Sequence, residues 1–155
     1  MKVDFINQSY RRFYKANKKE IDQAIQRCLS TGQLTLRKDV WDLEKSIAKY
    51  VGTKYAVGVG SGTDALFLSL SSLSIGKGDE VITVSNTFIA TIQAIVHTGA
   101  TPILVDVKED EQIDISQIEK VITKKTKAII PVHYTGAMCD MSSIMTIAKK
   151  HKLYV

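Results

Sequence analysis

Cysteine and proline are both scarce in this sequence, with two of each among 155 residues. Two cysteines without a C-x-x-C motif, and without a histidine at metal-ligand spacing, argue against a disulfide scaffold and against a zinc site. The apolar runs are short, and none approaches the roughly 20 residues that a membrane-spanning helix needs. The opening stretch MKVDFINQSYRRF carries charges where a signal peptide needs an uninterrupted apolar segment. We therefore expect a cytoplasmic protein with reduced thiols and no membrane partner.

Acidic residues are outnumbered by basic ones, 16 to 21, which gives a net charge of +5. Such an excess favours acidic ligands, among which nucleic acid must be considered. The lysines, however, occur in short groups on the polar faces and ends of expected helices, and no aromatic residues alternate with them. Solvated surface is the better interpretation, so we expect no nucleic-acid partner.

Apolar periodicity changes once along the chain, from helical spacing alone to an alternation of strands and helices. A capping box at Asn17 and Glu20 predicts a helix that ends near Gly32, and a second helix is expected from about Asp39 to Tyr50. Beyond it, strands are predicted at 54–59, 80–84, 101–107, 127–133 and 152–155, and helices at 64–74, 88–98, 114–124 and 142–151.

This alternation is typical of an α/β fold in which helices pack on a largely parallel sheet. We expect one incomplete domain over residues 1–155, with an amino-terminal helical segment at 1–52 and βαβ repeats at 53–155. Ligands of such sheets bind outside the carboxyl ends of the strands. The loops expected to carry function are therefore 60–64, 85–88, 106–113 and 133–141.

The stretch YAVGVGSGTDALFLSLSSL, residues 55–73, contains the first of these loops. Gly60 and Gly62 remove side chains where a strand is expected to turn into a helix, and Ser61 and Asp64 have capping-box spacing. The helix that follows is apolar nearly all round, which predicts that it is deeply buried. Free N–H groups and the helix dipole at such a turn favour a phosphate. A tight turn without a ligand is the alternative.

The segment GSGTDA also satisfies G-x-G-x-x-A, the dinucleotide-binding fingerprint. A Rossmann unit needs an acidic residue at the end of its second strand, but here that strand ends in VSNTF, which places Phe88 near the ligand position. An exposed aromatic side chain beside a phosphate turn is suited to stacking on a flat heteroaromatic ring. Phe88 could equally be a core residue at the start of a helix.

Four segments, YAVGVGSGTDALFLSL, GKGDEVITVSNTFIAT, GATPILVDV and TKAIIPVHYTGAMCDM, closely resemble successive segments of the DegT/StrS-type sugar aminotransferases in order and spacing. The resemblance extends over essentially the whole chain. It implies the amino-terminal part of the large domain of a fold type I enzyme. That enzyme uses pyridoxal 5′-phosphate to aminate a keto group on a nucleotide-linked sugar, in polysaccharide or glycan biosynthesis. It also implies an amino-acid amino donor and a homodimer.

Carried over position by position, the resemblance assigns the phosphate contacts of the cofactor to the backbone of Gly62 and Thr63. It assigns the aromatic residue that stacks on the cofactor ring to Phe88. The PVH segment places His133 and Tyr134 on the rim where cofactor and sugar meet. A hydrogen-bonded structural histidine is the alternative for His133.

The same resemblance implies that two catalytic groups lie beyond Val155: the carboxylate that pairs with the pyridine nitrogen, and the lysine that forms the Schiff base. We therefore expect the 155-residue chain to be an amino-terminal fragment without catalytic residues of its own. Two alternatives stay open. One is a truncated, non-catalytic remnant, and the other is a Rossmann-type dinucleotide-binding domain. The identity of the sugar, the carbon that is aminated and the amino donor do not follow from these residues.

Overall fold

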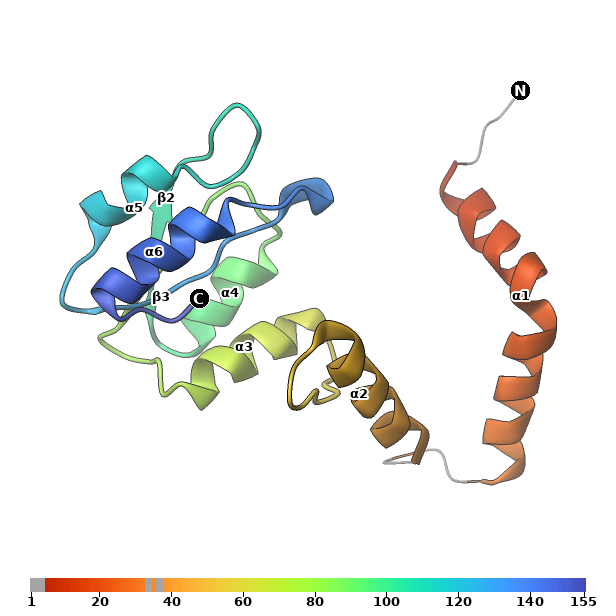
Figure 1. Cartoon of the computed structure of the whole chain (residues 1–155). Helices are drawn as coiled ribbons and strands as arrows, with labels where there is room; N and C mark the ends of the chain where they lie inside the picture. The colour runs from red at the N-terminus through yellow and green to blue at the C-terminus, as the bar shows by residue number, and fades with distance from the viewer. Residues whose placement is uncertain (1–4, 33–34, 36–37) are drawn as a thin grey trace. The chain divides into compact units, whose positions relative to one another are not determined.

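The structure is a computed structural model that describes residues 5–32, 35 and 38–155 (Figure 1). Its contacts divide the chain into two compact units, Met1–Gly58 and Val59–Val155. The second unit contains the sheet and all four loops that the sequence singles out. No helix in the described part of the chain is long and apolar enough to cross a membrane.

Two helices form most of the first unit, α1 at Phe5–Ser30 and α2 at Lys38–Val51. The predicted helix start at Asn17 is wrong, because α1 begins a full segment earlier. Asn17 instead interrupts α1 with non-helical backbone angles, φ −113° and ψ 15°. Its side-chain Nδ2 donates to Phe13 O at 2.9 Å, so the amide bonds to the preceding turn and does not cap the following one. The asparagine marks a kink.

The predicted strand at 54–59 is also wrong, because no described segment pairs with it. The segment is open to solvent, and the side chain of Val57 is 77% exposed. Gly58 N–H donates to Glu44 Oε1 at 2.7 Å, a side-chain partner in place of a neighbouring strand. Alternating apolar residues favour extended backbone locally, but a strand forms only when another strand supplies the hydrogen bonds.

A parallel sheet forms the centre of the second unit, with β1 at Glu80–Val84, β2 at Thr101–Val105 and β3 at Thr126–Ile129. The order is β2-β1-β3, and both outer strands run parallel to β1. Tyr154 adds a further parallel bridge, to Ala128 of β3. The predicted α/β fold with a parallel sheet is confirmed, although β2 and β3 end earlier than the strands predicted at 101–107 and 127–133.

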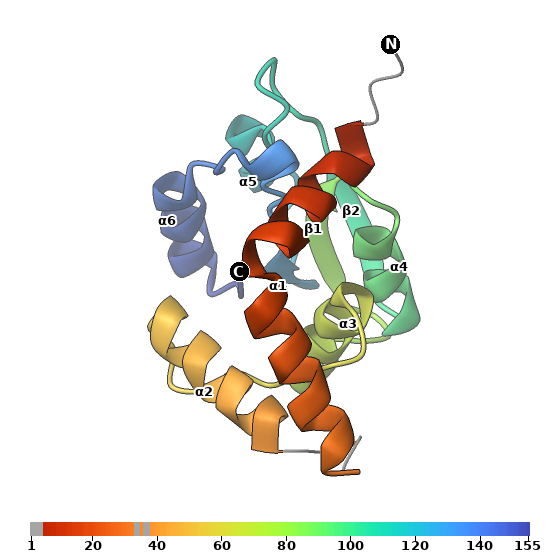
Figure 2. The same cartoon turned by 90° about the vertical axis from the view of Figure 1, so that its right-hand side faces the viewer.

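Helices cover both faces of this sheet, as Figure 2 shows for α4 and α6. Val81 of β1 packs in a cluster with α3 and α4, whereas Ile82 and Val84 pack in a second cluster with α5 and α6. Successive residues of a strand point to opposite faces, so the central strand supplies both cores. The helices are α3 at Gly62–Ser72, α4 at Ala90–His97, α5 at Ile115–Val121 and α6 at Met141–His151, with a 3₁₀ turn, η1, at Tyr134–Gly136.

The expectation that the helix after the glycine turn is deeply buried is wrong for this chain. Leu70 is the buried residue of α3, whereas Leu68 is 47% exposed and Leu73 is 39% exposed. α3 packs on α4 and on one face of the sheet, and the rest of its apolar surface is open. A helix that is apolar on all sides is expected to be packed on all sides. Among the described residues of this structure, α3 is packed on one side only.

Candidate functional site

The loops that follow the strands meet at the carboxyl ends of the strands, on one side of the sheet. Because β1, β2 and β3 are parallel, the segments 85–88, 106–113 and 130–139 all begin at the same end. The carboxyl end of α3 connects by a short loop to the amino end of β1. The amino end of α3, which begins at Gly62, therefore lies toward the carboxyl ends of the strands. The four elements therefore come together where α/β proteins bind ligands.

The first turn of α3 has the properties of an anion site. Ser61 is the N-cap, with its Oγ accepting from the Asp64 N–H at 3.1 Å. Within the described part of the chain, the N–H groups of Gly62 and Thr63 have no hydrogen-bond acceptor. The first N–H groups of a helix cannot bond within the helix, and those that the cap leaves open are available to a ligand.

The two glycines of this turn have different reasons to be glycine. A Cβ at position 60 would lie 2.7 Å from Asp64 Oδ2, so Gly60 leaves room for a side chain of the same turn. A Cβ at position 62 would meet nothing within 4 Å. The space beside Gly62 is therefore open, as a phosphate approaching the helix end requires. A cofactor that carries a phosphate fits this observation.

Phe88 lies at the beginning of the next helical segment, four residues after the last residue of β1. Its side chain is 76% exposed, so the alternative of a core residue is wrong. Its carbonyl oxygen accepts from Thr91 N–H at 3.0 Å, and the hydroxyls of Thr87 and Thr91 are 2.9 Å apart. The backbone is thus held by the first turn of α4 while the ring remains open to a partner.

His133 and Tyr134 lie together in the turn after β3. His133 is exposed, and its Nδ1 accepts from Cys139 N–H at 3.2 Å. Tyr134 is half-buried and begins the η1 turn. The structural role and the ligand role of His133 are compatible, because the first uses Nδ1 and leaves Nε2 for the second.

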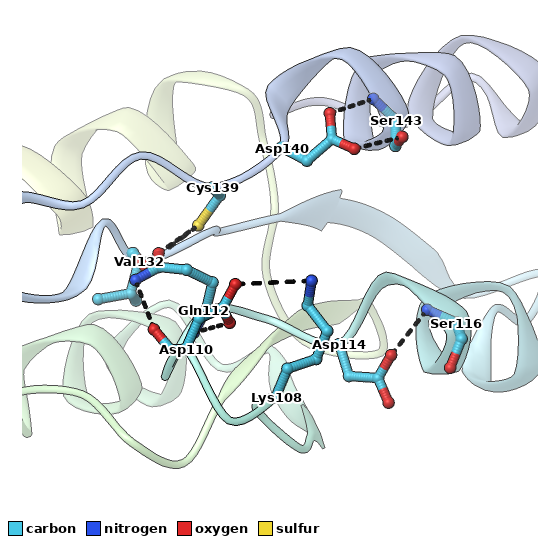
Figure 3. A network of polar contacts seen from close by, with 9 residues as sticks. All are labelled: Lys108, Asp110, Gln112, Asp114, Ser116, Val132, Cys139, Asp140 and Ser143. Carbon is cyan, nitrogen blue, oxygen red and sulfur yellow. Dashed lines mark hydrogen bonds and ion pairs between the residues drawn. The ribbon is translucent and has the colours of Figure 1, made fainter.

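Sequence reasoning missed two buried polar residues behind this turn. Gln112, in the loop after β2, is 6% exposed, and Cys139 is 4% exposed. Figure 3 shows them between the loop after β2 and the loop that leads to α6. The sequence identified Cys139 only as an ordinary reduced thiol, and it offered no signal for Gln112, since one glutamine in a polar loop has no motif.

Two acidic groups around these loops, Asp114 and Asp140, act as helix caps. Asp114 Oδ1 accepts from Ser116 N–H at 3.0 Å, and Asp140 Oδ1 accepts from Ser143 N–H at 3.1 Å. The hydrogen bonds from Ser143 hold the pKa of Asp140 below its ordinary value, and those from Ser116 and Gln117 do the same for Asp114. No cluster of potential metal ligands occurs in the part of the chain that the structure describes.

Comparison with known proteins identifies the family. The model of the DegT/DnrJ/EryC1/StrS aminotransferase family matches residues 15–155. This chain belongs to that family. Its members depend on pyridoxal 5′-phosphate.

Similar proteins include sugar transaminases. The dTDP-3-amino-3,6-dideoxy-alpha-D-galactopyranose transaminase of Aneurinibacillus thermoaerophilus is 50% identical over 138 residues, which cover 88% of this chain and 38% of the relative. The spore coat polysaccharide biosynthesis protein SpsC of Bacillus subtilis (strain 168) is 45% identical over 138 residues, 88% of this chain and 36% of the relative. The chain thus spans well under half the length of these relatives.

A solved structure of the family superimposes closely on this one. DesV of S. venezuelae, in complex with a ketimine intermediate, has a TM-score of 0.89 and is 42% identical, covering 92% of this chain and 39% of that chain. The fold is therefore that of the fold type I aminotransferases, as the sequence resemblance implies.

Proposed function

We propose that this chain is the amino-terminal, cofactor-binding part of an aminotransferase that acts on a keto sugar linked to a nucleotide. The observation that carries the proposal is the open amino end of α3, where unbonded N–H groups and an empty space beside Gly62 lie on the sheet edge that also carries the exposed Phe88. Family membership supplies the chemistry for which such an edge is suited.

In this proposal each site residue has one task. The N–H groups of Gly62 and Thr63 hold the phosphate of pyridoxal phosphate, with the dipole of α3 favouring its negative charge. Phe88 lies flat against the cofactor ring and excludes water from that side. His133 and Tyr134 bind the sugar at the rim. When bound, pyridoxal phosphate supplies an electron sink for the removal and addition of an amino group.

The lysine that attaches the cofactor is, in this proposal, absent from residues 1–155. Two lysines illustrate the support for this view. Lys77 lies in the loop before β1, close to Gly99 in the loop before β2. Both loops are at the amino ends of the strands, opposite the proposed site. Lys108 follows β2 on the correct edge, but its Nζ lies 3.7 Å from Asp110 Oδ2 as an ion pair. The amine of Lys108 is therefore already paired with a carboxylate of its own loop.

Further features of the parent enzyme belong to the same proposal. We place it in the cytoplasm, as a homodimer that takes its amino group from an amino acid. The name of the SpsC relative supports a role in polysaccharide biosynthesis. Exposed apolar side chains near the site, among them Ile89 and Met138, support a subunit contact there. A dinucleotide-binding role is less favoured, since Ser85 and Asn86 follow β1 where an acidic residue is needed.

A chimera tests the function directly. Residues 15–155 replace the matching segment of the A. thermoaerophilus transaminase, so that the rest of a catalytic subunit is present. We expect the chimera to bind pyridoxal phosphate and to transfer an amino group to a dTDP-linked keto sugar. A chimera with Gly62→Val serves as the matched control and should lose the cofactor. A folded chimera that binds no cofactor would overturn the proposal.

A further inference from the structure

A buried polar cluster joins the loop after β2 to the turn that carries His133. Its central residues are Gln112 and Cys139, which are 6% and 4% exposed. Neither has a task in the proposed function. Buried polar side chains in proteins are normally hydrogen-bonded, and leaving one unpaired is costly. Their partners therefore indicate which part of the backbone the cluster holds.

The amide of Gln112 faces two backbone carbonyl oxygens, those of Val132 and Ala137. With its nitrogen toward them, it donates to Ala137 O at 3.1 Å and to Val132 O at 3.3 Å. With its oxygen toward them, it accepts from Cys139 Sγ at 3.2 Å, while its nitrogen donates to Asp110 O at 3.3 Å. Carbonyl oxygens only accept, so the first orientation satisfies both of them.

Cys139 completes the cluster from the other side. Its Sγ lies 3.2 Å from Val132 O, and its backbone N–H donates to His133 Nδ1 at 3.2 Å (Figure 3). Gln112 and Cys139 together hold both ends of the segment 132–139. An imidazole whose Nδ1 accepts a hydrogen bond carries its proton on Nε2 when neutral.

The segment between these anchors is a strained turn. Thr135 has a φ of 53° and Gly136 a φ of 89°, so two successive residues are left-handed. For Thr135, which has a branched side chain, this conformation is unfavourable and persists only when the surroundings hold it. The amide of Gln112 supplies such a hold, because it bonds to residues on both sides of the turn.

We propose that Gln112 is a positioning residue that fixes the His133 turn, so that the imidazole presents its Nε2–H as a hydrogen-bond donor. The group it would meet is an oxygen acceptor of an oxygen-rich anionic ligand. This role for Gln112 rests on the proposed function only in assigning that ligand to the nucleotide-linked sugar. The hold on the turn follows from the cluster alone.

The tautomer of His133 gives a readout that does not need enzyme activity. The chain has three histidines, so ¹⁵N NMR of the 155-residue protein can follow each ring after assignment by substitution. We expect His133 to be predominantly the Nε2–H form in the unchanged protein. Gln112→Glu, which has the same shape but cannot donate, should shift His133 toward a mixture of tautomers. Gln93→Glu, on the exposed face of α4, is the matched control and should leave it unchanged.

The choice of Gln112→Glu also separates the two amide orientations. A carboxylate still accepts from Cys139 Sγ, so an unchanged tautomer in this variant would overturn the donor role of Gln112. Gln112→Asn keeps the amide on a shorter stem and guards against a variant that does not fold. If Gln112→Glu unfolds while Gln112→Asn folds, a shifted tautomer in Gln112→Asn supports the proposal and an unchanged one contradicts it.

Kinetics of the chimera separate this inference from the proposed function. We expect Gln112→Glu to raise KM for the nucleotide sugar at least fivefold, with kcat and the absorbance of the bound cofactor nearly unchanged. Activity with an unchanged KM would overturn the role of Gln112 in substrate binding. An inactive chimera in which the tautomer still responds to Gln112→Glu would instead remove the proposed function and retain the hold on the turn.

Discussion

At the scale of single residues, the candidate site depends on the space that two residues leave open. Gly62 leaves an empty space at the amino end of α3, and Phe88 leaves an aromatic face uncovered after β1. Neither residue contributes much to the core, so each can be changed without removing contacts that the fold needs. Ligand binding and stability should therefore respond separately to substitution here.

Gly62→Val should weaken binding of pyridoxal phosphate at least tenfold, about 1.4 kcal/mol, because the new side chain occupies the space that the phosphate requires. Gly62 is helical and a Cβ there has room, so Gly62→Ala should leave unfolding by urea unchanged or raise stability by about 0.4–1 kcal/mol. Cofactor titration of the chimera and urea unfolding of the 155-residue chain measure the two effects. Equal cofactor affinity in all three proteins would remove this site from consideration.

Phe88→Ala should lower cofactor affinity by roughly 0.5–1.5 kcal/mol, the contribution of one aromatic stack, without changing the stability of the fold. The ring is 76% exposed, so its removal leaves no cavity. Phe88→Tyr keeps the stacking face and is the control. Fluorescence titration of the chimera with pyridoxal phosphate measures the affinities, and a loss equal in both variants would argue against stacking.

At the scale of elements, the sequence predicts best what is local. The N-cap Ser61 and the helix it begins follow from spacing within one turn, and the order of strands and helices follows from apolar periodicity. The strand expected at 54–59 fails because its formation depends on a distant partner. The expected burial of α3 fails for the same reason, because the sequence pattern reveals an apolar face but not which element covers it.

Residues of the candidate site were predictable from the sequence only where a motif exists. Gly62 and Phe88 became candidates because a glycine turn and an aromatic residue at a strand end have a known chemical use. Gln112 was not, because its importance comes from two carbonyl oxygens that lie 20 or more residues away in sequence and become neighbours only in the fold. No local pattern encodes such a contact.

Asp140 at the start of α6 should make stability depend on pH. Hydrogen bonds from Ser143 lower its pKa in the folded state, so its contribution is present above the unfolded pKa, about 4, and is lost as pH falls through the folded value. Asp140→Asn keeps a capping oxygen that does not titrate. The variant should be less stable than the unchanged chain at pH 6, and this difference should shrink at pH 3.

Urea unfolding at the two pH values measures the effect, with Asp140→Ala as the variant that loses the cap at both. Asp114 caps α5 in the same way, so its own contribution remains in every protein compared. A difference between Asp140→Asn and the unchanged chain that grows toward pH 3 would contradict a lowered pKa for Asp140 in the folded state.

At the scale of the whole molecule, apolar surface is left open beside β3, at one outer strand of the sheet. A cavity of about 180 Å³ lies between α3 and β3 and is lined by Leu66, Leu70, Leu73, Ile130 and Tyr154, among others. Tyr154 pairs with β3 through both of its backbone groups: its N–H donates to Lys127 O and its carbonyl oxygen accepts from Ile129 N–H, each at 2.9 Å. Open sheet edges and apolar patches favour association with other chains.

The 155-residue chain by itself should therefore self-associate, bind pyridoxal phosphate weakly or not at all, and show no transaminase activity. Light scattering measures the first property. Absorbance of the protein after treatment with cofactor and borohydride and removal of free cofactor measures the second, because a reduced Schiff base leaves the cofactor covalently attached to the protein. A monomer that forms a reducible adduct and transfers an amino group would show that the catalytic lysine lies within residues 1–155.

Burial is most continuous along β1 and sparse in α1 and α2, and this difference has a consequence for the lifetime of the amide protons. Val81, Ile82, Thr83 and Val84 are each at most 1% exposed, whereas Ala48 is the buried residue among the described side chains of α1 and α2. Amides exchange with solvent through local opening, which costs least where little surface is buried. Hydrogen exchange should be slowest in β1 and fast throughout α1, and a protease should cut before Val59 while leaving the sheet intact.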